Sequence, residues 1–406
     1  MPEITEGMIA VDDALENVLA GVSQLGSEDI NIADAQGRIL AADVASHLTQ
    51  PPVDVSAMDG YAVRAQDVAT VPATLTQIGE SAAGSGFDGK IEAGQTTRIF
   101  TGAPVPEGAD AIVIQEDTDV DGDQITMKEA SPEGKFIRPA GLDFKKDEVL
   151  LKAGIRLNSR NTALAAAMNV PWLKVTRQPR VAILSTGDEL VMPGEPLGPE
   201  QIISSNSIGL AAFVQANGGV PINLGIAKDD PDSLRDILAT ITGADMLVTI
   251  GGASVGDYDL VKTVLGEEGL DITFSRVAMR PGKPLIFGKI NGIPMLGLPG
   301  NPVSAGVTAA LFLRPAINKM LGAADTTHVT ETAVLGRDLA ENDKRQDYIR
   351  ATLSIGSDGA LTAMPFGRQD SSMLARFAEA ACLVIRAPFA PPIKAGERVE
   401  IIRLDT

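Results

Sequence analysis

The sequence has almost no thiol or imidazole groups: among its 406 residues there are one cysteine, Cys382, and two histidines, His47 and His328. A single cysteine excludes an intramolecular disulfide, and these few ligands exclude a Cys/His zinc site. Cys382 stands in the apolar run 380–385, so we expect an inert core residue. These absences are typical of a protein that works in a reducing cytoplasm.

Positive charge is also scarce. The chain has 34 lysines and arginines against 53 aspartates and glutamates, which gives a formal net charge of −19. Nucleic acids and anionic membranes need a basic face, so we predict neither as a partner. An anionic ligand would have to be held by local groups.

Long apolar runs are missing as well. No stretch approaches the roughly 20 uninterrupted apolar residues of a membrane-spanning helix. Residues 1–6 lack the basic start and apolar core of a signal peptide. We therefore expect a soluble, cytoplasmic protein.

The length predicts several domains, because one compact core rarely exceeds about 250 residues. Apolar residues recur at helical spacing over 11–25, which predicts an N-terminal helix. Short β-favouring runs such as 97–100 and 111–114 indicate a small β-rich domain between about residues 30 and 141. Residues 162–168 favour a helix, and alternating runs after residue 329 indicate a C-terminal β domain.

Residues 180–321 alternate apolar strands with helices, which predicts a doubly wound α/β domain. The runs 181–184, 246–250 and 294–298 have the character of strands buried on both faces of a parallel sheet. Asp230 before Pro231 has the pattern of a helix cap followed by proline in the first turn. Asn206 is expected to cap a helix over 207–217 that stops at Gly218.

Glycine-rich loops follow the predicted strands of this domain: residues 251–259, 280–284 and 297–304, with acidic loops at 185–189 and 227–231. In an open parallel sheet such loops meet at the carboxyl ends of the strands, where free backbone N–H groups bind anions. Carboxylates beside an anion site suggest a bridging cation, and Mg²⁺ suits hard oxygen ligands. Arg280 and Lys283 flank a proline-stiffened turn that could aim both charges at a phosphate.

Each of these features also has a purely structural explanation. Glycine and proline loops are ordinary turns, and Asp230 is more readily a helix cap than a ligand. The structural explanation for the loop carboxylates is that they are simply solvated side chains of an acidic protein; these are Asp188, Glu189, Asp257 and Asp259. The recurrence of several such loops at one sheet edge favours a binding crevice.

The loops together resemble the MoeA-type molybdopterin molybdenumtransferase family, which is related to the C-terminal domain of gephyrin. The resemblance extends over essentially the whole chain. The matching motifs are Met58-Asp59-Gly60-Tyr61-Ala62, Phe100-Thr101-Gly102-Ala103-Pro104, Ser185-Thr186-Gly187-Asp188-Glu189-Leu190, Gly251-Gly252-Ala253-Ser254-Val255-Gly256, Pro281-Gly282-Lys283-Pro284 and Leu298-Pro299-Gly300-Asn301-Pro302-Val303-Ser304.

The resemblance implies a segmented N-terminal domain (residues 1–45 and 142–178) that carries an inserted β-rich domain (46–141), a molybdopterin-binding α/β domain (179–326) and a C-terminal β domain (327–406). It also implies a homodimer with its active cleft between subunits. The expected reaction inserts molybdate into adenylylated molybdopterin with a divalent metal, here Mg²⁺, and releases AMP and molybdenum cofactor.

Site residues follow from the matching positions. The resemblance implies catalytic roles for Asp59, Thr101, Glu189, Asp229 and Asp259; substrate contacts by Ser254, Gly256, Arg280, Lys283, Pro299, Asn301, Pro302 and Ser304; and metal binding by Glu189, Asp257 and Asp259. Two loops depart from the family pattern. Residues 203–206 lack an aspartate found in many members, and the spacing at 256–259 leaves open whether Asp257 or Asp259 binds the metal.

Two other functions remain alternatives at this point. The first is molybdopterin adenylyltransferase, the preceding enzyme, which has a similar α/β domain; the motif at Asp59 in an additional domain argues against it. This enzyme is also a possible contact partner. The second alternative is a non-catalytic scaffold that binds a partner peptide, for which the crevice carboxylates would be unnecessary.

Overall fold

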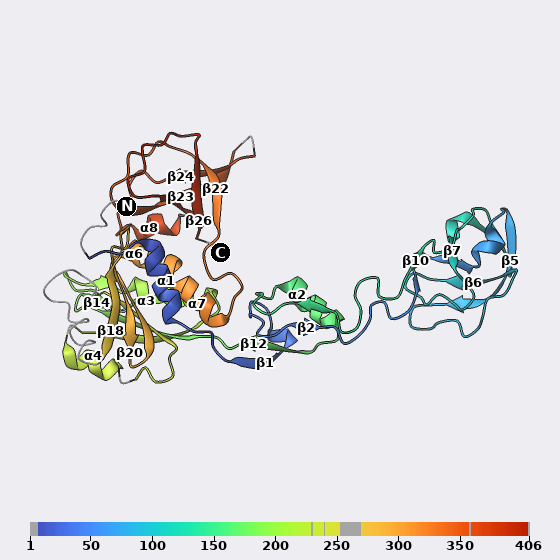
Figure 1. Ribbon diagram of the computed structural model, residues 1–406, viewed down its shortest axis with the longest axis horizontal. Coiled ribbons are helices and arrows are strands. Elements are labelled where there is room, and N and C mark those ends of the chain that lie inside the picture. The colour runs from blue at the N-terminus through green and yellow to red at the C-terminus, as the bar shows by residue number, and fades with distance from the viewer. Residues whose placement is uncertain (1–6, 229, 239, 252–268, 357–358, 405–406) are drawn as a thin grey trace.

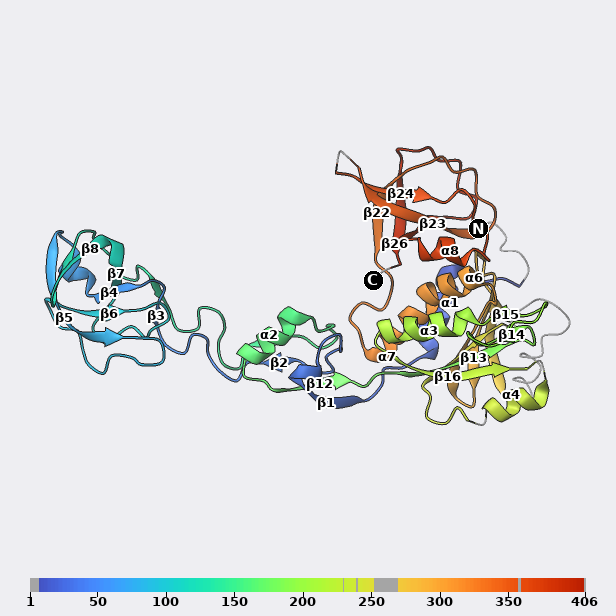
Figure 2. The ribbon, with the colours of Figure 1, turned by 180° about the vertical axis from the view of Figure 1, so that it is seen from behind.

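The computed structural model describes residues 7–228, 230–238, 240–251, 269–356 and 359–404. The molecule is elongated: an α/β domain and a C-terminal β domain lie at one end, and a β-rich domain lies at the other (Figure 1). A small domain lies between these ends in both views (Figures 1 and 2). The predicted architecture, with segmented, inserted, α/β and C-terminal β parts, is confirmed.

The α/β domain is built on a six-stranded sheet. In spatial order its strands are β16 (Val220–Ala227), β13 (Arg180–Thr186), β17 (Met246–Ile250), β21 (Ile293–Leu298), β20 (Pro284–Ile290) and β18 (Leu270–Arg276). The first four strands are mutually parallel, whereas β20 and β18 are antiparallel additions. The sheet is therefore mixed, although the sequence suggested a parallel one, because β18, β20 and β21 follow one another as antiparallel neighbours.

Both faces of the sheet are buried, as the apolar runs predicted. Successive side chains of a strand point to opposite faces. Val181 and Ile183 accordingly join one core, and Ala182 and Leu184 join another. The larger core also contains Leu383 and Ile402, so it continues into the C-terminal domain.

Helices pack on both faces of the sheet. They are α1 (Val11–Gly21), α3 (Ser205–Ala216), α4 (Pro231–Leu238), α6 (Pro302–Thr308), the π-helical segment η4 (Ala309–Leu313) and α7 (Arg314–Leu321); a short pair, β14 (Leu190–Val191) and β15 (Ile202–Ile203), flanks α3. Asp230 caps α4 as predicted, because its Oδ2 accepts the backbone N–H of Ser233 at 2.9 Å. The cap predicted at Asn206 is wrong: α3 starts at Ser205, two residues before the predicted start, and Asn206 donates to the backbone oxygen of Gly300 instead.

The middle domain is made of two separate chain segments. Its elements are β1 (Ser27–Asn31), the 3₁₀ turn η1 (Ile32–Asp34), β2 (Val44–Ala45), β11 (Val149–Leu151), α2 (Ser159–Ala167) and β12 (Trp172–Thr176). Strand β1 pairs with β12, and β2 pairs with β11. Each pair joins one segment to the other, so the chain that lies between them is an insertion.

The inserted domain has a six-stranded sheet with its own cores. Its elements are β3 (Val55–Ser56), β4 (Gly60–Val63), η2 (Ala65–Val68), β5 (Ala73–Ser81), β6 (Gln95–Ile99), β7 (Ala111–Ile114), η3 (Gln115–Asp117), β8 (Thr118–Asp121), β9 (Gln124–Met127) and β10 (Ile137–Arg138). Strands β3 and β10 pair at its base, where Val55 faces Arg138. Gln50 and Phe144 bridge closer to the middle domain, so the chain enters and leaves side by side.

The C-terminal domain is a closed barrel. Its elements are β22 (Thr330–Leu335), β23 (Gln346–Ile355), β24 (Leu361–Pro365), α8 (Leu374–Ala378), β25 (Cys382–Arg386) and β26 (Arg398–Arg403). Closure comes from β25, which pairs with both β26 and β23. Cys382 is fully buried in this barrel, and burial raises the pKa of its thiol to about 12, which agrees with an inert core residue. None of the helices in the described part of the chain has the length and apolar character that crossing a bilayer requires.

Candidate active site

The loops that follow the parallel strands meet at one edge of the α/β sheet. The backbone N–H of Gly187, after β13, donates to the oxygen of Ala227, at the end of β16, at 3.3 Å. The N–H of Gly251, after β17, donates to the oxygen of Leu298, at the end of β21, at 3.2 Å. The crevice edge predicted from the sequence is therefore formed by loops in direct contact.

Glycine is required where these loops touch. Gly251 has a φ of +90°, and a Cβ there would lie 2.7 Å from the backbone oxygen of Thr186. Such a contact is too short for any real side chain, and the backbone cannot move without breaking the sheet. A Cβ on Gly300 would lie 3.8 Å from the Cα of Gly251, so the third loop also passes close by.

Glu189 is an exposed carboxylate at this edge. Its side chain folds back over Gly187, because a Cβ built on Gly187 would lie 2.4 Å from Glu189 Oε2. Its backbone oxygen accepts the N–H of Ile202 at 2.8 Å, which ties the loop to β15. The carboxylate forms no hydrogen bond or salt bridge with the described residues.

Replacing Gly187 by alanine is therefore expected to displace the Glu189 carboxylate and to reduce turnover about tenfold, since small misplacements of a reacting group are costly. The φ of Gly187, +142°, also strains any other residue. Gly194→Ala is the matched control, because Gly194 has a φ of +92° with no atom within 4 Å of its Cβ position. Steady-state rates of both variants check the prediction, and equal losses would assign the effect to backbone strain.

The same third loop, residues 297–304, links the edge to the C-terminal domain. Asn301 donates its amide to Ser371 Oγ at 3.1 Å, and the backbone N–H of Val303 donates to the Ser371 oxygen at 3.1 Å. Pro299 is buried, and Pro302 is in the first turn of α6, whose fixed φ suits a helix start. Ser304 is buried inside α6. Ser371 was not anticipated, because nothing near it in the sequence signals a contact with α6.

Arg280 and Lys283 reach the same edge, because β18 ends there and the antiparallel β20 begins there. The guanidinium of Arg280 is fully engaged by the C-terminal domain: it pairs with Asp347, with Asp343 at 3.1 Å and with the Asn342 amide oxygen at 3.2 Å. Strand β19 (Met279–Arg280) pairs with β23, so both the backbone and the side chain of Arg280 join the α/β domain to the C-terminal domain.

Lys283 differs from Arg280. The Lys283 ammonium has no hydrogen bond or salt bridge with any residue in the described ranges. Gly282 before it packs on α6, where its Cβ would lie 2.5 Å from Thr308 Cγ2. Of the two cations predicted to receive an oxyanion, Arg280 is paired with carboxylates, whereas Lys283 has no partner within the described ranges.

The Asp59 and Thr101 side chains lie together on the inserted domain. Asp59 Oδ1 accepts both the backbone N–H of Thr101 at 2.7 Å and its hydroxyl at 2.8 Å. Both residues are exposed to solvent. These two hydrogen bonds, with a smaller contribution from Arg98, hold the pKa of Asp59 below its ordinary value.

This Asp59–Thr101 pair is far from the crevice edge within one chain. The inserted domain and the α/β domain occupy opposite ends of the molecule (Figures 1 and 2). In this structure, Asp59 and Glu189 of one chain therefore do not belong to the same site.

Several predicted site residues lie outside the described ranges. They are Asp229, Ser254, Gly256, Asp257 and Asp259. Glu189 is thus the one predicted metal ligand whose position is described, and its exposed carboxylate, which has no partner among the described residues, is a suitable oxygen donor for Mg²⁺. No cluster of three or more Asp, Glu, His or Cys side chains suited to a metal ion occurs in the described part of the chain.

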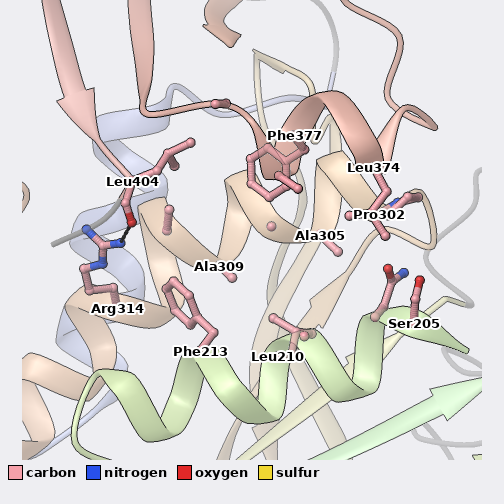
Figure 3. Close-up of a pocket in the computed structure, with 16 residues that line it drawn as sticks. Ser205, Leu210, Phe213, Pro302, Ala305, Ala309, Arg314, Leu374, Phe377 and Leu404 are labelled. Atoms are coloured by element: carbon pink, nitrogen blue, oxygen red, sulfur yellow. Dashed lines mark hydrogen bonds between the residues drawn. The ribbon is translucent and has the colours of Figure 1, made fainter. Parts of the chain in front are cut away.

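Two hollows accompany these groups. One, of about 340 Å³, runs from Asn206 and Pro302 along α3 and α6 to α8, and its walls are mostly apolar side chains such as Leu210 and Phe377 (Figure 3). The other, of about 470 Å³, lies at the base of the inserted domain beside Gly102. Two charged residues that the sequence reasoning missed, Arg138 and Asp143, line this second hollow. Neither stands in a glycine-rich motif, so no local signal marks them.

The fold and the crevice edge define the class: a multidomain protein whose α/β domain presents glycine-rich loops at the carboxyl ends of its parallel strands. Family models match three consecutive regions. They are the MoeA N-terminal region (domain I and II) over residues 9–169, a probable molybdopterin binding domain over 182–319, and the MoeA C-terminal region (domain IV) over 332–404.

Relatives with curated names cover nearly the whole chain. A molybdopterin molybdenumtransferase from Nostoc sp. is 39% identical, over 94% of this chain and 90% of the relative. One from Haemophilus influenzae is 34% identical, over 97% and 98%. A solved structure of the molybdopterin biosynthesis MoeA protein from Pyrococcus horikosii has a TM-score of 0.84 at 32% identity and covers 98% of this chain and 100% of the other. The chain belongs to the molybdopterin molybdenumtransferase family.

Proposed function

We propose that this enzyme inserts molybdate into adenylylated molybdopterin, releases AMP and so completes the molybdenum cofactor. The observation that carries the proposal is the similarity to molybdopterin molybdenumtransferases over 94–97% of the chain. The meeting of the glycine-rich loops at one sheet edge supports it, because the Lys283 ammonium beside them suits an anionic, phosphate-bearing substrate.

The residues have separate roles in this proposal. Lys283 would hold a phosphate or oxyanion, while Pro299, Asn301 and Pro302 shape the substrate pocket with Ser254, Gly256 and Ser304. Glu189 would bind Mg²⁺ together with Asp257 or Asp259, and a bound ion would neutralise phosphate charge. Asp59 and Thr101 would orient the reacting groups. Catalysis would then consist mainly of positioning, without a protein nucleophile.

The direct test incubates the purified protein with adenylylated molybdopterin, Mg²⁺ and molybdate, and measures AMP and molybdenum cofactor. Molybdate-dependent AMP release supports the transferase. Adenylylation of free molybdopterin by ATP would assign the protein to the preceding reaction, and no turnover in either assay would favour a scaffold. Omitting Mg²⁺ or replacing molybdate by tungstate tests the metal and the oxyanion separately.

We also propose a homodimer in the cytoplasm, with the Asp59–Thr101 pair of one chain completing the crevice of the other. The distance between these groups within one chain supports it (Figure 1). Contact with the molybdopterin adenylyltransferase would let that enzyme pass adenylylated molybdopterin directly to this one. The net charge of −19 supports the absence of a nucleic-acid partner.

Mixing two inactive variants tests the shared cleft. If Asp59→Asn and Glu189→Gln chains are refolded together in equal amounts, random pairing should restore roughly a quarter of the wild-type activity, because half the dimers are mixed and each has one intact site of two. Each variant refolded alone should remain inactive. Failure of the mixture to recover, with dimers present by light scattering, would contradict a site built from two chains.

A further inference from the structure

Arg98 stands beside the Asp59–Thr101 pair and is not explained by the fold alone. It lies on β6 opposite Tyr61 of β4. Its guanidinium carbon lies 5.0 Å from the centroid of the Tyr61 ring and 5.1 Å from that of Phe100. Stacking between two aromatic faces fixes the plane of a guanidinium, and Arg suits this better than Lys.

Both rings are close along the chain to Asp59 or Thr101. Phe100 directly precedes Thr101, and Tyr61 follows Asp59 by two residues. Tyr61 is only 5% exposed, so the surrounding core holds its ring in one position. The stack on Arg98 therefore holds together the two chain segments that carry Asp59 and Thr101.

Hydrogen bonds also connect Arg98 to the chain segment that carries Asp59. Arg98 Nη2 donates to the Gln115 side-chain oxygen at 2.5 Å, and Nη1 donates to the backbone oxygen of Gly60 at 3.4 Å. The backbone N–H of Gln115 donates to the backbone oxygen of Asp59 at 3.1 Å. A continuous ring of contacts thus runs from Arg98 through Gln115, Asp59 and Thr101 and back to the stack.

The charge of Arg98 is not used in a salt bridge with any carboxylate of the described residues. The positive charge of Arg98 contributes to the lowered pKa of Asp59 and so favours the ionised carboxylate. The Arg98 guanidinium therefore affects Asp59 in two ways: its contacts hold the segment that carries Asp59, and its charge favours the ionised carboxylate.

We propose that Arg98 is the positioning residue of the Asp59–Thr101 pair and aligns both side chains toward the substrate. The proposal rests on the proposed transferase function, and Arg98 itself need not touch the substrate. The matched variants are Arg98→Lys, which keeps the charge but loses the planar fork, and Arg98→Gln, which loses both. Lys128→Gln is the control, since it removes an exposed cation that pairs with Asp119 on the same sheet.

Three measurements on the full-length protein separate alignment from folding. Turnover of Arg98→Gln should fall about tenfold to a hundredfold, the range expected when a reacting group is misplaced. The acid limb of its rate profile should move to higher pH, because Asp59 loses a charge that favours its ionised form and is protonated earlier as the pH falls. Arg98→Lys should lose rate but keep the wild-type acid limb.

The third measurement does not depend on activity. The amide resonance of Thr101 reports its hydrogen bond to Asp59, so its pH titration in ¹⁵N-labelled protein should shift upward in Arg98→Gln and stay in place in Lys128→Gln. Wild-type turnover and a wild-type Thr101 titration in Arg98→Gln would overturn the proposal. If Arg98→Gln does not fold, an unchanged rate in Arg98→Lys would overturn it. An inactive wild-type enzyme, or an active Asp59→Asn variant, would instead contradict the proposed function.

Discussion

Replacing Asp59 by asparagine is expected to reduce molybdate-dependent AMP release by about 10²–10³-fold, the usual loss when a charge that acts in the transition state is removed. Asparagine keeps an oxygen that can accept both hydrogen bonds from Thr101, which are 2.7 and 2.8 Å long in the native protein. The inserted domain should therefore keep its fold. The change tests the charge of Asp59 and leaves its position largely unaltered.

Asp121→Asn is the control for this substitution, because Asp121 is an exposed aspartate on β8 of the same sheet. Circular dichroism and thermal unfolding should be the same for both variants and the native protein. The wild-type acid limb should lie below the ordinary aspartate range, since Thr101 lowers the pKa of Asp59 and the carboxylate stays ionised until the pH falls through that lowered value. An Asp59→Asn enzyme of native activity would remove Asp59 from the site.

Replacing Arg280 by alanine is expected to destabilise the junction between the α/β and C-terminal domains by about 1–3 kcal/mol, because it leaves buried hydrogen-bond acceptors unpaired. The Asp347 side chain is only 10% exposed, whereas the Arg280 side chain is 46% exposed, so solvent screens part of the effect. Asp347 Oδ1 already lacks a partner among the described residues. Burial raises the pKa of Asp347 more than Arg280 lowers it, so removing Arg280 favours a protonated carboxyl.

Urea unfolding curves measure this effect. Arg376→Ala is the control, since Arg376 and Glu379 form an exposed pair one helical turn apart. Asp347→Asn combined with Arg280→Ala should recover part of the lost stability, because no charge is then left buried. If Arg280→Ala unfolds like the native protein but loses turnover, Arg280 contacts the substrate and the junction does not depend on it.

The sequence predicted the features that depend on local patterns. Helix α1, the strands buried on both faces and the cap at Asp230 follow from periodicity and short-range hydrogen bonding. The loops at the crevice edge followed from a general rule about parallel sheets. The family resemblance supplied the order of the domains, which no local pattern contains.

The errors and omissions have a common physical cause: they depend on contacts between distant parts of the chain. Asn206 has the right chemistry for a cap, but the Gly300 oxygen, 94 positions away, takes its amide. The pairing of Arg280 with Asp347 joins residues 67 positions apart in two domains. Nothing in either segment specifies the partner, so the sequence could not show that the Arg280 charge is paired within the protein.

The way the chain enters and leaves the inserted domain has a mechanical consequence. The neck is a ribbon of two antiparallel segments, with Gln50 facing Phe144 and Val55 facing Arg138. Two-stranded ribbons twist more and resist bending less than wider sheets. The neck therefore joins the inserted domain to the rest of the chain through few backbone hydrogen bonds, and a bend there would leave the cores on either side intact.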